Sequence, residues 1–376
     1  MGINGFLAFL KKKYPHVIRK EHISLFSFTR VFIDISGYIY KYMSTFGKQD
    51  YKWINAILST LHTFKSNSVI PIPVFDGKPP VSKEHEIKDR KEKRQQHSIR
   101  IETLQESINA YQEGTYTDNH IQNLQEEMVK LEKRGQFHSR LLKPSSNPFT
   151  TEDMVQLKEH LNILQRQFIS ITEQDITLLK TIFKDLGITY VQAPGESEGL
   201  CCSLVRNGEG YAVASGDSDC IMHRANVVIL QVDYNGMCTY IENSEILETL
   251  HLTAEQLVDY GILMGCDYNL HCKNNKLGPV NALKLIQEYK SIENIPDHLL
   301  HKDTLLTELC REMFTVKIED DINLIHDVVS NEDVIEKYKN MEGISSMVLK
   351  QLIEIQSKIL IYKSNNHKKY HIIYED

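Results

Sequence analysis

The chain has 376 residues, of which 41% are hydrophobic and 25% charged, a balance typical of a folded globular protein of one large domain or two ordinary ones. Its 43 Lys and Arg against 50 Asp and Glu give a net charge of −7, which at first sight argues against a nucleic-acid partner. Seven cysteines, odd in number and without a Cys-x-x-Cys pair, indicate neither a disulfide framework nor a zinc site. They favour a reducing compartment.

The amino terminus, "MGINGFLAFLKKKYPH", places a short apolar patch before its lysines. This order is wrong for a secretory signal, and the patch is too short to span a membrane, so we expect neither secretion nor membrane attachment. Gly2 fits a myristoylation pattern, but Phe6 stands where that pattern requires Ser or Thr. The segment is therefore expected to be part of the folded protein.

Four apolar, β-branched runs, at 30–37, 69–80, 187–199 and 210–219, are bounded by turn residues and separated by helical patterns. This alternation predicts an α/β fold with a mostly parallel sheet flanked by helices. A fifth stretch, 257–269, has helical rather than extended spacing, and Thr253 with Gln256 forms a possible capping box before it.

Each of these stretches contains one or two acidic residues at the point where its strand or helix should end. They are Asp34, Asp76, Glu196, Glu198, Asp217, Asp219 and Asp267. Any one of them is explained by turn chemistry, because Asp, Ser and Gly are ordinary residues of a chain leaving a strand. Parallel sheets bind their ligands at the carboxyl ends of the strands, however, and seven acids meeting at that edge predict a shared site.

Seven neighbouring carboxylates repel one another unless cations are present, and Mg²⁺ is a cation that prefers oxygen ligands. Two such ions about 4 Å apart can activate a water and stabilise both oxygens of an in-line displacement at phosphorus, so the predicted reaction is phosphodiester hydrolysis. Without these seven acids, 43 of the 50 Asp and Glu remain, equal to the 43 Lys and Arg. The rest of the surface is then neutral on average and free to carry basic patches.

Six motifs, "MGINGFLAFL", "VFIDIS", "VFDGKPP", "APGESEG", "ASGDSDC" and "LMGCDY…LGPVNALKLI", occur in the order found in the XPG and flap-endonuclease family of structure-specific 5′ nucleases, which this chain resembles over residues 1–100 and about 180–290. The resemblance implies a PIN-like nuclease core with two Mg²⁺ ions per site, for which Mn²⁺ can substitute. It also implies cutting near junctions of single- and double-stranded DNA. The seven acids fall on the family's metal-site positions.

The resemblance also implies that Lys83 and Arg90 act catalytically at the scissile phosphate, and their seven-residue spacing allows them to share one helical face. Tyr40 lies where the family has a tyrosine that stacks on a base beside the cut, although it could equally be a core residue of the helix after Asp34. Gly2 would allow close backbone approach to the DNA and the metals.

The run 83–100 contains seven Lys or Arg and four Asp or Glu. Such a run is usually a solvated helix with ion pairs four residues apart. Beside a phosphate-cutting site we favour a DNA-binding role, and assign it to Lys88, Lys93 and Arg94.

The spacer between Asp76 and Glu196 is longer than in a typical flap endonuclease, and we interpret residues 83–175 as an enlarged helical arch elaborated into a hairpin. Apolar residues repeat at helical spacing on both sides of the loop "KPSSNP". They are Ile121, Leu124, Met128 and Leu131, and then Met154, Leu157, Leu161, Leu164, Phe168 and Ile171. The last series resembles a coiled-coil seam. The alternative is that residues 83–175 only pack over the nuclease core and cover it.

A helix-hairpin-helix DNA-binding turn is recognisable at 276–286, with Lys276 and Gly278 as predicted DNA contacts. Asn275, Lys276 and Val280 depart from the family pattern. Whether this turn binds duplex DNA and a monovalent cation, as it does in the family, is therefore left open.

We divide the chain into 1–82 and 176–290 as the nuclease core, 83–175 as the arch, and 291–376 as a C-terminal helical region. The tail lacks a sliding-clamp motif, and a monomer is expected.

These features predict a Mg²⁺-dependent DNA endonuclease that cuts 5′ flaps, with 5′→3′ exonuclease activity, in replication, repair or recombination. A bubble, gap or junction nuclease of the same family is the alternative, because an enlarged arch could change how a 5′ end is admitted. A catalytically silent DNA-binding scaffold fits less well, since all seven acids are present. The expected location is the nucleus or, for a viral protein, the host nucleus or a cytoplasmic replication site.

Overall fold

A computed structural model of the chain describes residues 2–48, 50–80, 83–133, 149–269, 277–315 and 331–363. It divides into two compact units, which are considered separately. The first comprises Met1–Tyr42, Lys48–Glu86 and Ile171–Asp376, and the second comprises Met43–Gly47 and Ile87–Ser170. Within the described ranges, no helix has the length and apolar character needed to cross a bilayer.

The first unit is built on one sheet with strand order β1-β7-β6-β5-β2-β3-β4. Its strands are β1 Arg19–His22, β2 Arg30–Asp34, β3 Ile70–Phe75, β4 Val191–Gln192, β5 Ala212–Ala214, β6 Val227–Val232 and β7 Met237–Glu242. The pairings among β4, β3, β2, β5 and β6 are parallel, whereas β7 pairs antiparallel with β6 and β1. The predicted α/β fold with a mostly parallel sheet is therefore confirmed, and the four predicted runs contain β2, β3, β4 and β5.

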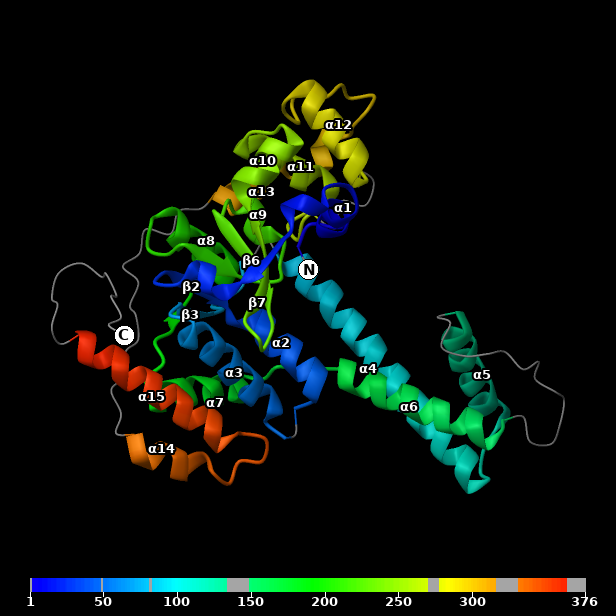
Figure 1. The fold of residues 1–376 in the computed structure, drawn as a ribbon. Coiled ribbons are helices and arrows are strands. Elements are labelled where there is room, and N and C mark those ends of the chain that lie inside the picture. Colours follow the sequence, from blue (N-terminus) through cyan, green and yellow to red (C-terminus); the bar gives the residue numbers. More distant parts are fainter. Residues whose placement is uncertain are drawn as a thin grey trace. The chain divides into compact units, whose positions relative to one another are not determined.

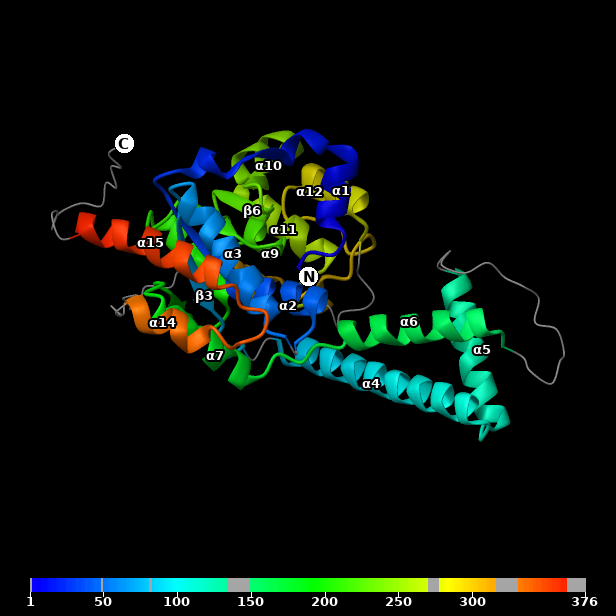
Figure 2. The ribbon, with the colours of Figure 1, turned by 60° about the horizontal axis from the view of Figure 1, so that its bottom comes forward.

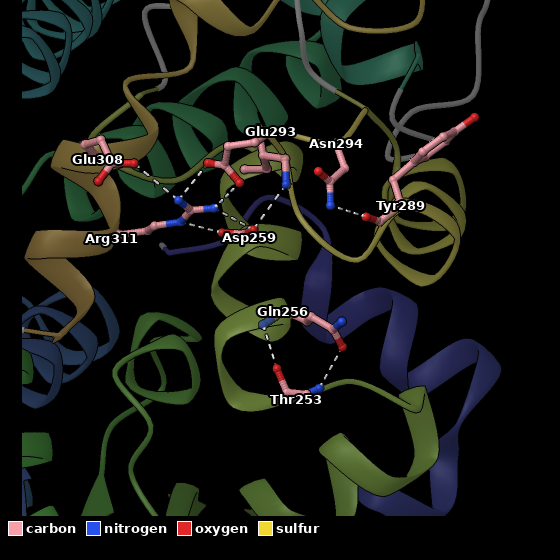
Figure 3. Close-up of polar contacts among 9 residues, drawn as sticks. Thr253, Gln256, Asp259, Tyr289, Glu293, Asn294, Glu308 and Arg311 are labelled. Carbon is pink, nitrogen blue, oxygen red and sulfur yellow. Dashed lines mark hydrogen bonds and ion pairs between the residues drawn. The ribbon is translucent and has the colours of Figure 1, made fainter. Parts of the chain in front are cut away.

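Helices cover both faces of this sheet (Figure 1). The described helices of the first unit are α1 Phe6–Lys13, α2 Ile35–Phe46, α3 Lys52–Ser66, α7 Glu173–Asp185, α8 Ser197–Arg206, α9 Asp219–Met222, α10 Asn243–Leu250, α11 Ala254–Met264, α12 Pro279–Tyr289, α13 Thr307–Thr315, α14 Asn331–Tyr338 and α15 Ser346–Lys363. Phe32, Val74 and Val213 of neighbouring strands belong to one core cluster with α1 and α8 to α13. The predicted capping box of Thr253 and Gln256 opens α11, as drawn in Figure 3.

Strand register sets where the sheet ends. In the parallel pairs, Asp34 of β2 lies beside Val74 of β3, and Ile33 of β2 lies beside Ala214 of β5. Phe75, the last residue of β3, pairs with Gln192 of β4. The four strands therefore finish at the same edge, and the loops that leave them begin side by side.

The second unit is helical, with α4 Glu84–Glu113 running into it, followed by α5 Asp118–Lys133 and α6 Thr151–Gln167 (Figure 2). Its apolar cluster includes Leu104 and Ile108 of α4, Leu124 of α5, and Leu157 and Leu161 of α6. The predicted seam is thus buried from Met154 to Leu164, but Phe168 is 37% exposed and stacks on His97 instead. A capping box at Thr150 begins α6.

A buried charged group lies within this second unit. Glu127 accepts hydrogen bonds from Arg100 and Lys130, and His160 lies 3.3 Å from its Oε2. Burial acts to raise the pKa of Glu127, but the bonds from the two cations outweigh it and lower the pKa to about 2. This arrangement holds α4, α5 and α6 together by polar contacts as well as apolar packing.

Helix α13 is clamped to α11 by a bidentate ion pair (Figure 3). Arg311 donates to both carboxylate oxygens of Asp259 at 2.7 Å, and also to Glu293 at 2.7 and 3.1 Å. The amide of Ile292 donates to Asp259 as well, at 3.3 Å. Asp259 is 4% exposed, so these partners, and not water, stabilise its negative charge.

Replacing Arg311 with Ala should lower the free energy of unfolding by about 3 kcal/mol, because it leaves a buried carboxylate without its cation. Urea unfolding of the metal-free protein measures this. Lys52→Ala, which removes the exposed Lys52–Asp50 pair, serves as the control and should cost less than about 1 kcal/mol. Equal losses for the two variants would contradict the clamp.

Candidate active site

Each predicted acid lies at the same edge of the sheet in the first unit. Asp34 ends β2, Asp76 follows β3, Glu196 and Glu198 begin α8, Asp217 and Asp219 follow β5, and Asp267 follows α11. Four of them are buried, namely Asp34, Asp217, Asp219 and Asp267. The structure therefore brings together all seven acids that the sequence analysis selected.

Two serines organise Asp34 at the centre of this group. Ser197 Oγ donates to Asp34 Oδ1 at 2.8 Å, and Ser215 Oγ donates to Oδ2 at 3.0 Å. The amide of Ser197 also donates to Asp76 Oδ1 at 2.8 Å. Because Ser197 belongs to the first turn of α8, the start of that helix joins the ends of β2 and β3.

Gly77 allows the loop after β3 to meet the loop after β4. Its amide donates to the carbonyl of Gly195 at 2.6 Å, and a Cβ at this position would lie 2.2 Å from the carbonyl oxygen of Ala193. No larger residue fits without moving the backbone. This contact sets Asp76 close to Glu196.

Asp217 and Asp219 form a tight turn and also contribute to the acidic group. The amide of Asp217 donates to Ser215 Oγ at 3.1 Å, and that of Asp219 donates to Asp217 Oδ1 at 3.0 Å. These bonds are the turn chemistry that the sequence also allowed. However, Asp219 Oδ1 is buried and, within the described residues, accepts no hydrogen bond. A buried oxygen without a partner is costly and indicates a ligand that the turn itself does not supply.

Burial and neighbouring charges raise the pKa of four of the acids. Burial, and then the charge of Asp76, raise the pKa of Asp34 to about 6 despite its hydrogen bonds from serine. Burial followed by the charges of Asp34 and Asp76 raises the pKa of Glu198 well above its usual value. The pKa values of Asp217 and Asp219 are raised by burial first and by neighbouring acids next. The group therefore stores electrostatic repulsion when it is ionised.

Lys83 places a positive charge in this group. It lies immediately before α4, in the first unit, and is 8% exposed. Its Nζ lies 2.6 Å from Glu196 Oε1 and 3.4 Å from Asp267 Oδ2. Burial acts to lower the pKa of Lys83, but Glu196 and Asp267 outweigh it, so the pKa is raised and the ammonium stays charged.

The donor set suits hard divalent cations, although the side chains do not yet enclose one. Within the described ranges, no three His, Cys, Asp or Glu side chains are gathered closely enough to hold a metal ion. The carboxylate oxygens are nevertheless the ligands that Mg²⁺ prefers, and the unpaired Asp219 Oδ1 is available. The chemistry of these oxygen donors therefore fits a divalent metal.

The amino terminus packs against the same group. Gly2 has φ +83°, and a Cβ there would lie 2.0 Å from Asp217 Oδ1 and 2.6 Å from Ser218 Oγ. The next amide, of Ile3, donates to Ser218 Oγ at 2.8 Å. Glycine is thus required at position 2 by the close contact of its backbone with Asp217 and Ser218. The predicted approach of Gly2 to the DNA and the metals stays a prediction.

Most of the remaining predicted site residues belong to helices α2 and α4 or to the start of α12, and one lies outside the described chain. Tyr40 of α2 is 52% exposed, so the core alternative for it is wrong. Arg90, Lys88, Lys93 and Arg94 belong to the part of α4 in the second unit, where Arg90 is half-buried and the other three are exposed. Gly278 caps α12, and Lys276 lies outside the described residues. Their roles in binding or cleaving DNA stay predictions.

Sequence reasoning missed three residues that hold the acids in place. Ser197 and Ser215 lie one to two residues from acids in "GESEG" and "ASGDSD", a proximity that was a usable signal. Tyr268 follows Asp267 directly, and its hydroxyl donates to Glu196 Oε2 at 2.9 Å. Nothing in the sequence indicates a contact between residues so far apart along the chain.

Comparison with known proteins now identifies the family. The XPG N-terminal domain matches residues 1–97, and the XPG I-region matches residues 187–267. Flap endonuclease 1 of the yeast Vanderwaltozyma polyspora is 32% identical over 315 residues, covering 80% of this chain and 69% of that protein. The chain belongs to the XPG and flap-endonuclease family. It is a structure-specific nuclease, an enzyme that hydrolyses phosphodiester bonds.

Two further relatives agree with this family assignment. A probable RAD2-like endonuclease of invertebrate iridescent virus 6 is 27% identical over 315 residues, covering 78% of this chain and 73% of that protein. The solved catalytic core of Rad2 in complex with DNA substrate superposes with a TM-score of 0.60 at 17% identity, covering 96% of this chain and 99% of that one. The XPG and flap-endonuclease fold is thus matched along nearly the whole chain.

Gly2→Ala should slow cleavage at least about tenfold, because the added Cβ displaces Asp217 and small misplacements at a reacting centre are costly. Gly5→Ala is a matched control, since Gly5 also has positive φ, at +73°, but an added Cβ there meets nothing within 4 Å. It should cost roughly 1 to 2 kcal/mol of stability through backbone strain and keep its activity. Single-turnover cleavage and thermal melts measure both variants, and normal cleavage by Gly2→Ala would contradict the assignment.

Asp217→Asn should raise the melting temperature of the protein in chelator. The pKa of Asp217 is raised in the fold, so its ionised form destabilises the protein at neutral pH, and Asn keeps the oxygen that accepts from Asp219. The advantage should shrink as the pH falls and the wild-type carboxyl becomes protonated. Added Mg²⁺ should stabilise the variant less than wild type.

Asp233→Asn is the control for that measurement. Asp233 also accepts two turn amides, from Asn235 and Met237 at 2.9 Å, but lies away from the acidic group in the β6–β7 turn. It should not gain stability in chelator. A lower melting temperature and nearly normal cleavage for Asp217→Asn would favour the ordinary turn interpretation instead.

Proposed function

We propose that this nuclease is a divalent-metal-dependent DNA endonuclease that cuts 5′ flaps, with associated 5′→3′ exonuclease activity, in DNA replication, repair or recombination. The observation that carries the proposal is the convergence of seven acids and Lys83 at one edge of the sheet. We expect a monomer that works where DNA is replicated or repaired, in a nucleus or at a viral replication site.

Two Mg²⁺ ions, for which Mn²⁺ can substitute, would be held by oxygens of Asp34, Asp76, Glu196, Glu198, Asp217, Asp219 and Asp267. When bound, they would supply an acidified water and neutralise charge on the phosphate oxygens. Their charges would also offset the burial and the charge of Asp76, which together raise the pKa of Asp34 to about 6. The same attraction between the metal ions and the carboxylates would therefore bind the metal and reduce the repulsion among the acids.

The chain's own residues position the reacting groups. Ser197 and Ser215 hold both oxygens of Asp34, which keeps this buried carboxylate in one orientation. Lys83, charged and nearly buried, is placed to stabilise negative charge as it develops on the scissile phosphate. Catalysis then depends on preorganised charge rather than on a covalent intermediate with the protein.

Binding to DNA is supported by the relatives and by surface chemistry. The Rad2 core to which the chain is similar was solved with a DNA substrate. The exposed side chains of Lys88, Lys93 and Arg94 suit contacts with phosphates, and exposed Tyr40 suits stacking on an unpaired base. Substrates that contain both single and double strands fit this combination.

A bubble, gap or junction nuclease is the second candidate. The second unit has its own buried cluster, including Leu104, Leu124 and Leu161, and a capped helix α6. An arch that is internally packed in this way can restrict which 5′ ends are admitted. Cleavage of purified protein on labelled flap, nicked, bubble and four-way junction DNA, with Mg²⁺ or with EDTA, separates the candidates. Equal cleavage with EDTA, or no cleavage of any substrate with Mg²⁺, would refute the proposal.

Lys83→Ala should slow single-turnover cleavage by about 100-fold while changing the Kd for flap DNA much less, because a buried cation at this position acts on transition-state charge. Arg90→Ala is predicted to behave similarly. Lys20→Ala, on the exposed edge strand β1, is a control that should alter neither quantity. Equal losses of affinity and rate in Lys83→Ala would mean that the residue only holds DNA.

A further inference from the structure

Tyr268 contacts both the acid and the cation of the proposed catalytic group. Its hydroxyl donates to Glu196 Oε2 at 2.9 Å, and Lys83 Nζ lies 5.0 Å from the centroid of its ring. Lys83 Nζ in turn lies 2.6 Å from the other carboxylate oxygen, Glu196 Oε1. The three side chains therefore form a closed triangle of contacts in which each oxygen of Glu196 has its own partner.

The backbone around Tyr268 is firmly held. Asn269, the next residue, is 3% exposed and accepts from the amide of Cys266 at 2.9 Å. Its Nδ2 donates to the carbonyls of Ile262 at 3.0 Å and Leu305 at 3.2 Å. The turn that carries Asp267 and Tyr268 is thus tied both to α11 and to the segment before α13.

Helix α13 forms the wall behind Tyr268. Phe314 meets the Tyr268 ring edge-on, with centroids 5.4 Å apart, and also meets His223 at 5.0 Å. One turn earlier, Cys310 Sγ lies 3.7 Å from Cys266 Sγ. The Arg311 clamp of Figure 3 fixes this helix to α11, so the Tyr268 ring, which is 1% exposed, has little freedom to move.

We propose that Tyr268 is a positioning residue that orients Glu196 and Lys83, and that Phe314 fixes Tyr268 for this task. The hydroxyl that holds Glu196 Oε2 fixes the direction of Oε1, which contacts Lys83 in this structure. Such outer partners commonly tune metal ligands. The ring face also stabilises the ammonium of Lys83 in a buried setting. The importance of this role for metal binding rests on the proposed function.

Tyr268→Phe tests this inference, because it keeps the ring for Lys83 and Phe314 and removes only the hydroxyl. Calorimetric titration with Mg²⁺ in the absence of DNA should show that the variant binds Mg²⁺ about 10- to 100-fold more weakly than wild type. Single-turnover cleavage should slow to a similar extent, with little change in the Kd for DNA.

Tyr260→Phe is the matched control, since Tyr260 is equally buried and its hydroxyl donates to the carbonyl of Pro279 at 3.1 Å, away from Glu196. It should leave Mg²⁺ affinity unchanged.

A double-mutant cycle in chelator gives a result that does not depend on metal. Tyr268→Phe and Glu196→Ala should shift the melting temperature non-additively, because they remove the same hydrogen bond. Tyr268→Leu should reduce cleavage further than Tyr268→Phe through loss of the ring under Lys83. Wild-type protein that binds no Mg²⁺ would refute the proposed function, and the cycle would then decide the role of Tyr268. Wild-type Mg²⁺ affinity in Tyr268→Phe, or additive shifts, would overturn this inference alone.

Discussion

Mutual repulsion among carboxylates is the constraint on which this structure depends. Seven acids meet where parallel strands end, and burial raises the pKa of Asp34, Glu198, Asp217 and Asp219. The fold tolerates this because serine hydroxyls hold Asp34 and because the ammonium of Lys83 lies beside Glu196. The same repulsion favours binding of divalent cations, so the feature that strains the metal-free protein is the one that suits it to phosphodiester hydrolysis.

The surrounding scaffold resists that strain through packing and a few strong polar contacts. Strands β2, β3 and β5 are buried between helices, and α13 supports the site from behind through Phe314 and the Arg311–Asp259 pair. The sequence analysis assigned residues 291–376 only to a C-terminal helical region, yet Phe314 of α13 contacts Tyr268 directly. Helix α13 therefore supports the acidic group of the first unit directly.

The features that could be predicted from the sequence are those that depend on residues close together along the chain. Apolar runs ending in acids located β2, β3 and β5, and turn residues located Asp34, Asp76 and Asp217, because strand length and side-chain chemistry are local properties. The sequence did not predict the antiparallel strand β1, whose "RKEH" is polar and exposed, or the end of the α6 seam at Leu164. The roles of Ser197 and Tyr268 depend on contacts between distant segments, which no spacing rule encodes.

The most direct test of the account is the position of metal in crystals of the protein soaked with Mn²⁺, located by anomalous scattering. The account predicts two peaks among the carboxylates of Asp34, Asp76, Glu196, Glu198, Asp217, Asp219 and Asp267, with Glu196 still bonded to the Tyr268 hydroxyl. No peak at this edge of the sheet, or metal bound only elsewhere on the protein, would contradict it.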